Sequence, residues 1–150
     1  EPSDDTTLIT LGGAVSFSDG GIQFEIGSHP RFLGLVRNCA ADLLAGVDGK
    51  IISEIQVALT EAVTNVIRHT YNNDQTQKIE LGMRRAASQI EIVVRDFGAR
   101  VDPAKLVGRA LEDVRPGGLG IHFMRQMFSV VEYDPAVSDG NRLVLRRNLA

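Results

Sequence analysis

The sequence predicts an α+β domain in which a mostly antiparallel sheet carries about three main helices on one face. Two pairs of segments look like paired strands joined by turns, which is the pattern of antiparallel hairpins. Segments with helical periodicity separate them, and these have one apolar face. Hairpins combined with one-sided helices favour two layers, a sheet and its helices, over a doubly wound parallel sheet.

The first elements are a strand and two helices. Residues 22–26 alternate apolar and polar side chains and are predicted to form a strand. Ser28 is expected to cap a helix over residues 29–45, with Pro30 in its first turn. A longer helix is predicted over residues 50–69. Its apolar face consists of Ile52, Ile55, Leu59, Ala62, Val63 and Val66.

A predicted hairpin follows, with strands over residues 78–85 and 89–95. In the second strand Ile90, Ile92 and Val94 are expected to share one face.

The last elements are a helix and a second hairpin. Residues 97–116 have a loop-like pattern with a short helix at 104–111, and a third main helix is predicted to start near Gly118. Two closing strands are expected over residues 130–133 and 142–147, joined by a turn at Asp139-Gly140-Asn141.

Composition limits the classes of function. The chain of 150 residues has a net charge of −3, so it lacks the basic bias typical of direct nucleic-acid binding. No apolar run is long enough to span a bilayer, and the acidic N-terminus does not look like a signal peptide. We therefore expect a cytoplasmic protein without membrane contact. Residues 1–21 are interpreted as a tail or linker, and residues 22–150 as one domain.

The long helix holds the first chemical feature. Glu61, Asn65 and His69 are spaced four residues apart and form one polar stripe at the edge of the apolar face. The amide oxygen of Asn65 suits a magnesium ion that also binds phosphate oxygens. The carboxylate of Glu61 could accept a proton from an attacking hydroxyl. Taken alone, such a stripe is more often an incidental polar edge of a helix.

Two further features involve glycines. Asp96-Phe97-Gly98 follows an apolar strand, so its carboxylate could accept a hydrogen bond from an exocyclic amine such as that of adenine, while Gly98 lets a flat base approach. An ordinary turn would give the same pattern.

Gly117, Gly118 and Gly120 open a helix, where exposed backbone N–H groups attract phosphate. A flexible loop with a capping glycine explains one of these glycines but not all three.

Two resemblances to other nucleotide motifs are rejected. Gly49-Lys50 lacks the glycine spacing of a phosphate-binding loop, and Ile51 replaces the required Ser or Thr. Gly118-x-Gly120 starts like a dinucleotide fingerprint, but Phe123 takes the place of its third glycine.

Taken in order, these motifs resemble the GHKL superfamily of histidine-kinase-like ATPases and kinases. Residues 61–71 (EAVTNVIRHTY) resemble the signature of its serine-kinase anti-sigma factors. Residues 96–103 (DFGARVDP) and 117–125 (GGLGIHFMR) are similar to the same branch. The resemblance covers about residues 22–147, and the combination of motifs is more specific than any one of them.

The resemblance implies a Bergerat-type two-layer α/β sandwich that binds ATP and Mg²⁺ beneath a lid over residues 100–117. By motif position, Asn65 would hold the metal, Glu61 would be the catalytic base, and Thr64 and Asp96 would recognise adenine. His69 would support the site. The remaining residues of the implied nucleotide site are Gly98, Lys105, Arg109, Arg115, Gly117, Gly118, Leu119, Gly120 and Ile121. Arg100 departs from the broader superfamily, which has a second glycine there.

The resemblance also implies a function and partners. Such proteins bind a sigma factor, phosphorylate a serine or threonine of an anti-anti-sigma STAS-domain protein, and often form homodimers. The alternative is an ATP-binding switch that sequesters a regulator without kinase activity. A third interpretation, the catalytic half of a two-component histidine kinase, is less favoured because Glu61 stands where that class has Asn.

Overall fold

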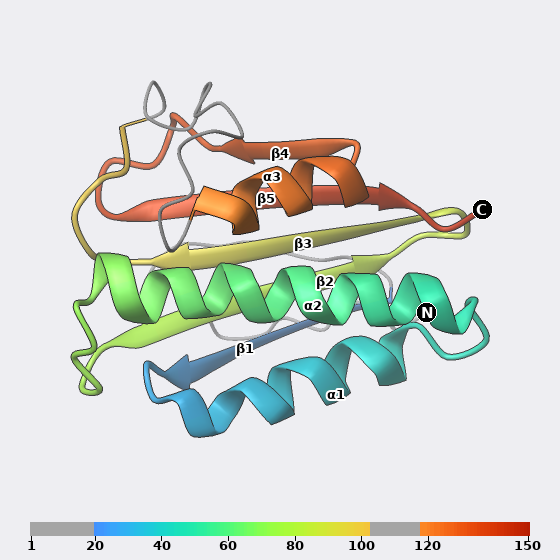
Figure 1. Ribbon diagram of the computed structural model, residues 1–150, viewed down its shortest axis with the longest axis horizontal. Coiled ribbons are helices and arrows are strands. Elements are labelled where there is room, and N and C mark those ends of the chain that lie inside the picture. Colours follow the sequence, from blue (N-terminus) through green and yellow to red (C-terminus); the bar gives the residue numbers. More distant parts are fainter. Residues whose placement is uncertain (1–19, 103–117) are drawn as a thin grey trace, which may run out of the picture.

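The protein has two layers, a sheet and a set of helices that cover one of its faces (Figure 1). The computed structural model describes residues 20–102 and 118–150. Within them, five strands form one sheet in the order β1-β2-β3-β5-β4, and every neighbouring pair is antiparallel. Three α-helices are present in these ranges. The predicted α+β class with a largely antiparallel sheet is therefore confirmed.

The strands fall close to where the sequence predicts them. They are β1 (Gly21–Gly27), β2 (Lys78–Arg85), β3 (Gln89–Asp96), β4 (Val130–Tyr133) and β5 (Asn141–Asn148). The bounds of β2 and β4 match the prediction, and the other three strands are longer by one or two residues. The extension of β3 brings Asp96 into the sheet, directly opposite Asn141 of β5.

The helices confirm the prediction in number but not in every bound. They are α1 (Leu33–Leu43), α2 (Gly49–Asn65) and α3 (Gly118–Met127). Beyond α2 the chain continues as a wider π-helical turn over Val66–Thr70, so the predicted helix over 50–69 is not uniformly α-helical. No helix in the described ranges combines the length and apolarity needed to cross a membrane.

The predicted cap of the first helix is wrong. A 3₁₀ turn over Pro30–Phe32 precedes α1, and its cap is His29, whose Nδ1 accepts a hydrogen bond from the Arg31 backbone nitrogen at 3.0 Å. Ser28 instead extends the pairing of β1 with β2, because its backbone nitrogen donates to the Gln77 carbonyl at 2.9 Å. Its hydroxyl donates to the carbonyl of Asp74. Ser28 is thus engaged by the sheet and unavailable to the helix.

The core lies between the helices and one face of the sheet. Ile90, Ile92 and Val94 of β3 are at most 2% exposed, which confirms that they share the inner face. The predicted apolar face of α2 is also confirmed. Ile55, Leu59, Ala62, Val63 and Val66 are buried, and Ile52 is half-buried. This packing fixes α2 over the sheet and places its C-terminal end beside the end of β3 (Figure 1).

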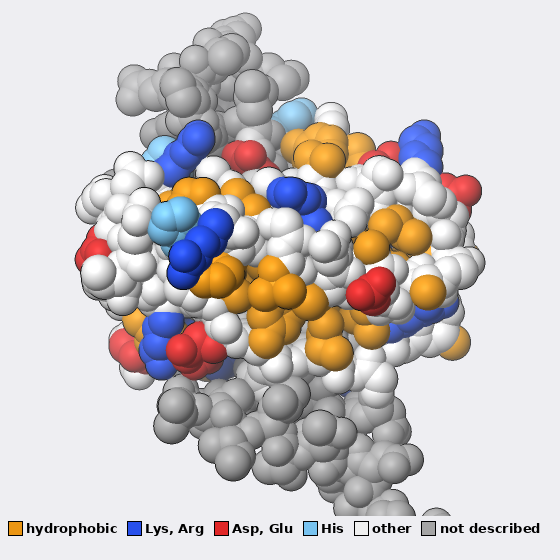
Figure 2. Space-filling model, turned by 90° about the horizontal axis from the view of Figure 1, so that it is seen from below, with side chains coloured by type: hydrophobic (Ala, Val, Ile, Leu, Met, Phe, Trp, Pro, Cys, Tyr) orange, Lys and Arg blue, Asp and Glu red, His pale blue; other side chains and the backbone are white. Residues whose placement is uncertain are grey.

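Apolar side chains gather on the side of the molecule where α1 lies (Figure 2). Figure 2 views the side on which α1 lies in Figure 1 and shows hydrophobic side chains gathered across its middle. Among the described residues, Leu35 of α1 and Val57 of α2 are the large hydrophobic residues that are exposed. Exposed hydrophobic side chains are common on folded proteins. The exposed apolar side chains are therefore not treated as a binding site.

The turn before β5 requires glycine at position 140. Gly140 has φ of 60°, a backbone conformation that costs a residue with a Cβ about 1–2 kcal/mol. A Cβ there would also overlap the backbone of Asp96. The turn therefore packs directly on the end of β3, and this contact sets how Asp96 and Asn141 face each other.

We expect Gly140→Ala to lower the free energy of unfolding by about 2–5 kcal/mol, because backbone strain and overlap add together. Gly46→Ala is a matched control, since Gly46 has φ of 85° but no atom within 4 Å of the position that a Cβ would take. It is expected to cost only the strain, about 1–2 kcal/mol. Urea unfolding followed by circular dichroism measures both values. Equal losses in the two variants would contradict the close packing of the turn.

Candidate functional site

A cavity of about 170 Å³ lies between the C-terminal end of α2 and the sheet. Side chains from α2 and its π-helical turn, from β3, β4 and β5, and from α3 line it. This volume is more than ten times what one water molecule needs, about 10–15 Å³. The cavity is thus large enough for part of a small-molecule ligand.

The lining of the cavity is mainly apolar. The apolar lining residues are Ala62, Val66, Val94, Val101, Ile121, Met124 and Leu143. Asn65, His69, Thr70, Asp96 and Tyr133 supply the polar groups. A mostly apolar wall with a few fixed polar groups is typical of sites for flat organic ligands.

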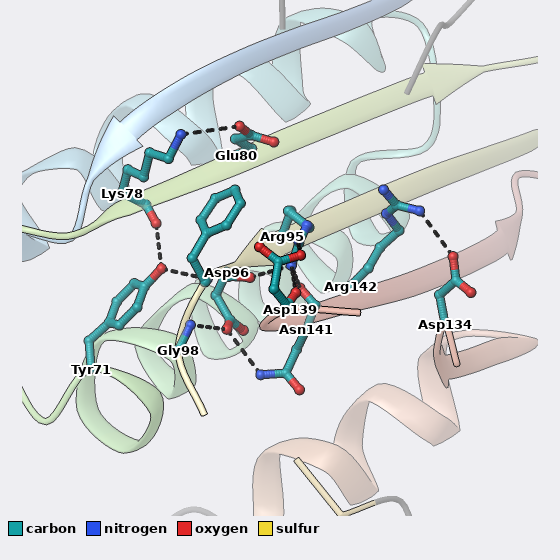
Figure 3. A network of polar contacts seen from close by, with 11 residues as sticks. Tyr71, Lys78, Glu80, Arg95, Asp96, Gly98, Asp134, Asp139, Asn141 and Arg142 are labelled. Atoms are coloured by element: carbon teal, nitrogen blue, oxygen red, sulfur yellow. Dashed lines mark hydrogen bonds and ion pairs between the residues drawn. The ribbon is translucent and has the colours of Figure 1, made fainter. Parts of the chain in front are cut away.

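Asp96 is the buried charged group of the cavity. It is 3% exposed, and its Oδ1 accepts hydrogen bonds from Asn141 Nδ2 and from the Gly98 backbone nitrogen, each at 3.0 Å (Figure 3). Burial raises the pKa of the Asp96 carboxyl, and these hydrogen bonds act in the opposite direction. Neither hydrogen bond uses Oδ2. Two hydrogen bonds to Oδ1 therefore stabilise the ionised form of the Asp96 carboxylate.

The loop after Asp96 is held by Tyr71. The Tyr71 hydroxyl accepts a hydrogen bond from the Phe97 backbone nitrogen at 2.8 Å and donates to the Lys78 carbonyl at 2.6 Å (Figure 3). The Phe97 ring also contacts the ammonium group of Lys78 and the guanidinium group of Arg95, which lie 4.6 and 4.4 Å from its centroid. These contacts fix the backbone on both sides of Asp96.

Arg95 joins the end of β3 to the turn before β5. It is 7% exposed, and its Nη2 lies 2.9 Å from a carboxylate oxygen of Asp139. Its Nη1 donates to the backbone carbonyls of Asp139 and Asn141 at 2.7 and 3.3 Å (Figure 3). Arg95 thus satisfies carbonyl groups of the turn that brings Asn141 to Asp96.

Two glycines predicted for the site lie where a side chain would not fit. A Cβ on Gly98 would overlap the Thr70 methyl group, so the loop after β3 packs tightly on the π-helical turn. A Cβ on Gly120 would overlap the Glu61 side chain. The start of α3 therefore approaches α2 at Glu61, which places the carboxylate beside the first turn of α3.

The structure brings several of the predicted site residues together. Asn65, His69, Asp96 and Ile121 line the cavity, and Gly98 lies next to it. Glu61 and Thr64 are half-buried on α2 and are not part of the lining. Gly118, Leu119 and Gly120 are the first residues of α3. Lys105, Arg109, Arg115 and Gly117, together with most of the predicted lid and the short helix at 104–111, lie outside the described residues.

Sequence reasoning misses Asn141 and Tyr133. The sequence places Asn141 only in a turn, yet its side chain is buried against Asp96. Tyr133 ends β4 opposite Leu143 and lines the cavity, and burial raises its pKa to about 12. The alternation of β4 does place Tyr133 on the same face as Val131. That it reaches the cavity follows only from the pairing of β4 with β5.

The chain is similar to known proteins over most of its length. Residues 26–147 match the family model described as the histidine kinase-like ATPase domain. The serine-protein kinase RsbW of Oceanobacillus iheyensis is 25% identical over 121 residues, which are 74% of this chain and 77% of the relative. The anti-sigma F factor of Clostridium beijerinckii is 26% identical over 136 residues, 87% of this chain and 95% of the relative. The serine/threonine-protein kinase BtrW of Bordetella bronchiseptica is 29% identical over 77 residues, 49% of this chain and 54% of the relative.

The family model covers most of the chain, and every element from α1 to β4 lies within the matched residues. The expected α+β arrangement and the observed one agree with this match. The chain therefore belongs to the histidine kinase-like ATPase domain family.

Proposed function

We propose that this chain binds ATP with Mg²⁺ and transfers the terminal phosphoryl group to a serine or threonine of a partner protein. The observation that carries the proposal is Asp96, a buried carboxylate in an apolar cavity whose polar lining includes Asn65. A carboxylate of this kind accepts a hydrogen bond from an exocyclic amine, and the apolar lining suits a purine ring.

In this proposal the adenine base enters the cavity. Asp96 accepts a hydrogen bond from the adenine amine, and Gly98 lets the base lie against the backbone. Thr64 is proposed to assist from α2, and His69 supports the site where it lines the cavity. The residues present therefore fit the base of ATP.

Asn65 is proposed to hold the magnesium ion. It belongs to the cavity lining and sits one helical turn after Glu61. The described residues contain no group of three or more His, Cys, Asp or Glu side chains that could hold a metal ion. An amide oxygen together with phosphate oxygens and water is a ligand set that Mg²⁺ accepts. When bound, the ion would neutralise charge on the phosphates.

Phosphoryl transfer needs a base and a place for the phosphates. We assign the base to Glu61, which would accept the proton of the attacking hydroxyl as the new phosphorus–oxygen bond forms and ADP leaves. The first residues of α3, Gly118, Leu119, Gly120 and Ile121, are proposed to meet the phosphates, because backbone N–H groups at a helix start attract anions. Gly120 lies against the Glu61 side chain, so the proposed phosphate site at the start of α3 is next to the proposed catalytic base. Lys105, Arg109, Arg115 and Gly117 are proposed to add phosphate contacts.

The partners are proposed from the names of the relatives. Several are named serine-protein kinase RsbW and others anti-sigma F factor. We therefore propose that this chain binds a sigma factor, phosphorylates an anti-anti-sigma STAS-domain protein and so regulates transcription in the cytoplasm. A homodimer is part of the proposal. The alternative, a switch that sequesters its partner without kinase activity, differs only in the absence of phosphoryl transfer.

Asn65→Ala is expected to abolish most of the gain in ATP affinity that Mg²⁺ provides, a loss of about tenfold or roughly 1.4 kcal/mol. Isothermal titration with Mg²⁺ and with EDTA separates the metal-dependent part of the affinity. Asn38→Ala, an exposed change on α1, is the matched control and should leave both values unchanged. Unchanged Mg²⁺ dependence in Asn65→Ala would count against the metal role.

Glu61→Ala and the closer isostere Glu61→Gln are expected to keep ATP affinity but to lower phosphoryl transfer by about 10²–10⁴-fold, because the base is lost. The assay follows radiolabelled phosphate from ATP to a STAS-domain protein of the same organism. Asp42→Asn removes an exposed carboxylate on α1 and is the control. Transfer retained in Glu61→Gln would remove Glu61 as the base, whereas a wild type that binds ATP and a sigma factor without transfer would favour the alternative.

A further inference from the structure

The side-chain amide of Asn141 is buried and hydrogen-bonded at both its nitrogen and its oxygen. It is 5% exposed and stands opposite Asp96 at the start of β5. Its Nδ2 donates to Asp96 Oδ1 at 3.0 Å and to the Ala99 carbonyl at 2.8 Å. Its Oδ1 accepts from the Val101 backbone nitrogen at 2.7 Å. Both N–H groups and the oxygen therefore have partners, so the amide is held from three directions (Figure 3 shows its contact with Asp96).

These partners allow one orientation of the amide. If the amide were flipped, its oxygen would face the Asp96 carboxylate and the Ala99 carbonyl, and its NH₂ group would face the Val101 N–H. All three contacts would then be repulsive. Asn141 thus presents a donor to Asp96, and this donor satisfies Oδ1 from within the protein.

We propose that Asn141 is a positioning residue that makes the nucleotide site select purines with an exocyclic amine over purines with an oxo group at the same position. The proposal rests on the proposed function, because it assigns the base to the cavity beside Asp96. Asn141 Nδ2 and the Gly98 N–H both donate to Oδ1, and we assign the other oxygen of the carboxylate, Oδ2, to the ligand.

The selectivity follows from which groups can donate. An ionised carboxylate only accepts hydrogen bonds, so it pairs with the amine of adenine and repels the oxo group of hypoxanthine. A neutral carboxyl could donate to that oxo group and would not discriminate. Burial raises the pKa of Asp96 toward this neutral form, and the hydrogen bond from Asn141 is the first of the opposing effects. Removing the Asn141 donor therefore destabilises the ionised carboxylate of Asp96, which is the form that discriminates between the two bases.

A purely structural role for Asn141 predicts a different result. Asn141 also ties Ala99 and Val101 to β5, so its loss could loosen the cavity. Loosening would weaken the binding of every nucleotide by the same factor. Loss of positioning would weaken ATP alone, since ITP bound in the same pose presents an oxo group, not a donor, where the amine of adenine meets the carboxylate. The ratio of ATP to ITP affinity therefore separates the two roles.

The test is isothermal titration of the full chain with Mg-ATP and with Mg-ITP. The variants are Asn141→Ala, the isosteric Asn141→Asp, and the control Asn148→Ala at the exposed far end of β5. We expect the wild type and the control to prefer ATP. In Asn141→Ala the ATP affinity should fall roughly tenfold, the scale of a hydrogen bond to a charged group, with ITP affinity within about twofold. Asn141→Asp keeps an acceptor for Val101 but sets an oxygen against Asp96, so it should also lose the preference.

Equal weakening of ATP and ITP in Asn141→Ala and Asn141→Asp would overturn the positioning role and leave the nucleotide site intact. An unchanged ratio with unchanged affinities would overturn it as well. A wild type that binds neither Mg-ATP nor Mg-ITP would instead overturn the proposed function itself. The double variant Asp96→Asn/Asn141→Ala, compared with Asp96→Asn alone, tests whether Asn141 acts through Asp96. If Asn141 acts through Asp96, the second change leaves the ATP to ITP ratio of Asp96→Asn unaltered.

Discussion

The hydrogen bond between Asn141 of β5 and Asp96 of β3 holds the buried carboxylate in the wall of the cavity. The other contacts of the site depend on this position of Asp96. The hydrogen bond exists because β3 and β5 pair antiparallel in a register that sets these two residues opposite each other. Gly140 permits the close turn before β5, and Arg95 satisfies the carbonyl groups of that turn. A buried carboxylate without such donors would be costly, so the fold and the charge depend on each other.

The helix layer contacts the site at two places, the loop after β3 and the start of α3. Tyr71 and Thr70, just after α2, pack against the loop that carries Gly98, which holds the cavity wall in place. Farther up α2, Glu61 lies against Gly120 at the start of α3. One helix thereby spans from the proposed base-binding cavity to the start of α3, where the phosphates are proposed to lie.

Much of the fold could be predicted from the sequence because it depends on local patterns. The predicted hairpins place β2 and β4 at their observed bounds, and helical periodicity predicts the buried face of α2. The cap at Ser28 was wrong because pairing of that residue with Gln77 is a tertiary contact. The motifs pointed to Asn65 and Asp96, which do share the cavity. Asn141 and Tyr133 were missed because strand pairing, not spacing along the chain, brings them there.

If Asp96 forms part of an ATP site, added nucleotide stabilises the folded protein, and thermal unfolding measures this effect. A ligand that binds only the folded state stabilises it by about 2.7 kcal/mol at a concentration of 100 Kd. We predict that ATP with Mg²⁺ raises the Tm of the wild type and that Asp96→Asn loses most of this rise. No rise in the wild type would mean that the protein does not bind ATP, and an equal rise in Asp96→Asn would mean that Asp96 takes no part in binding it.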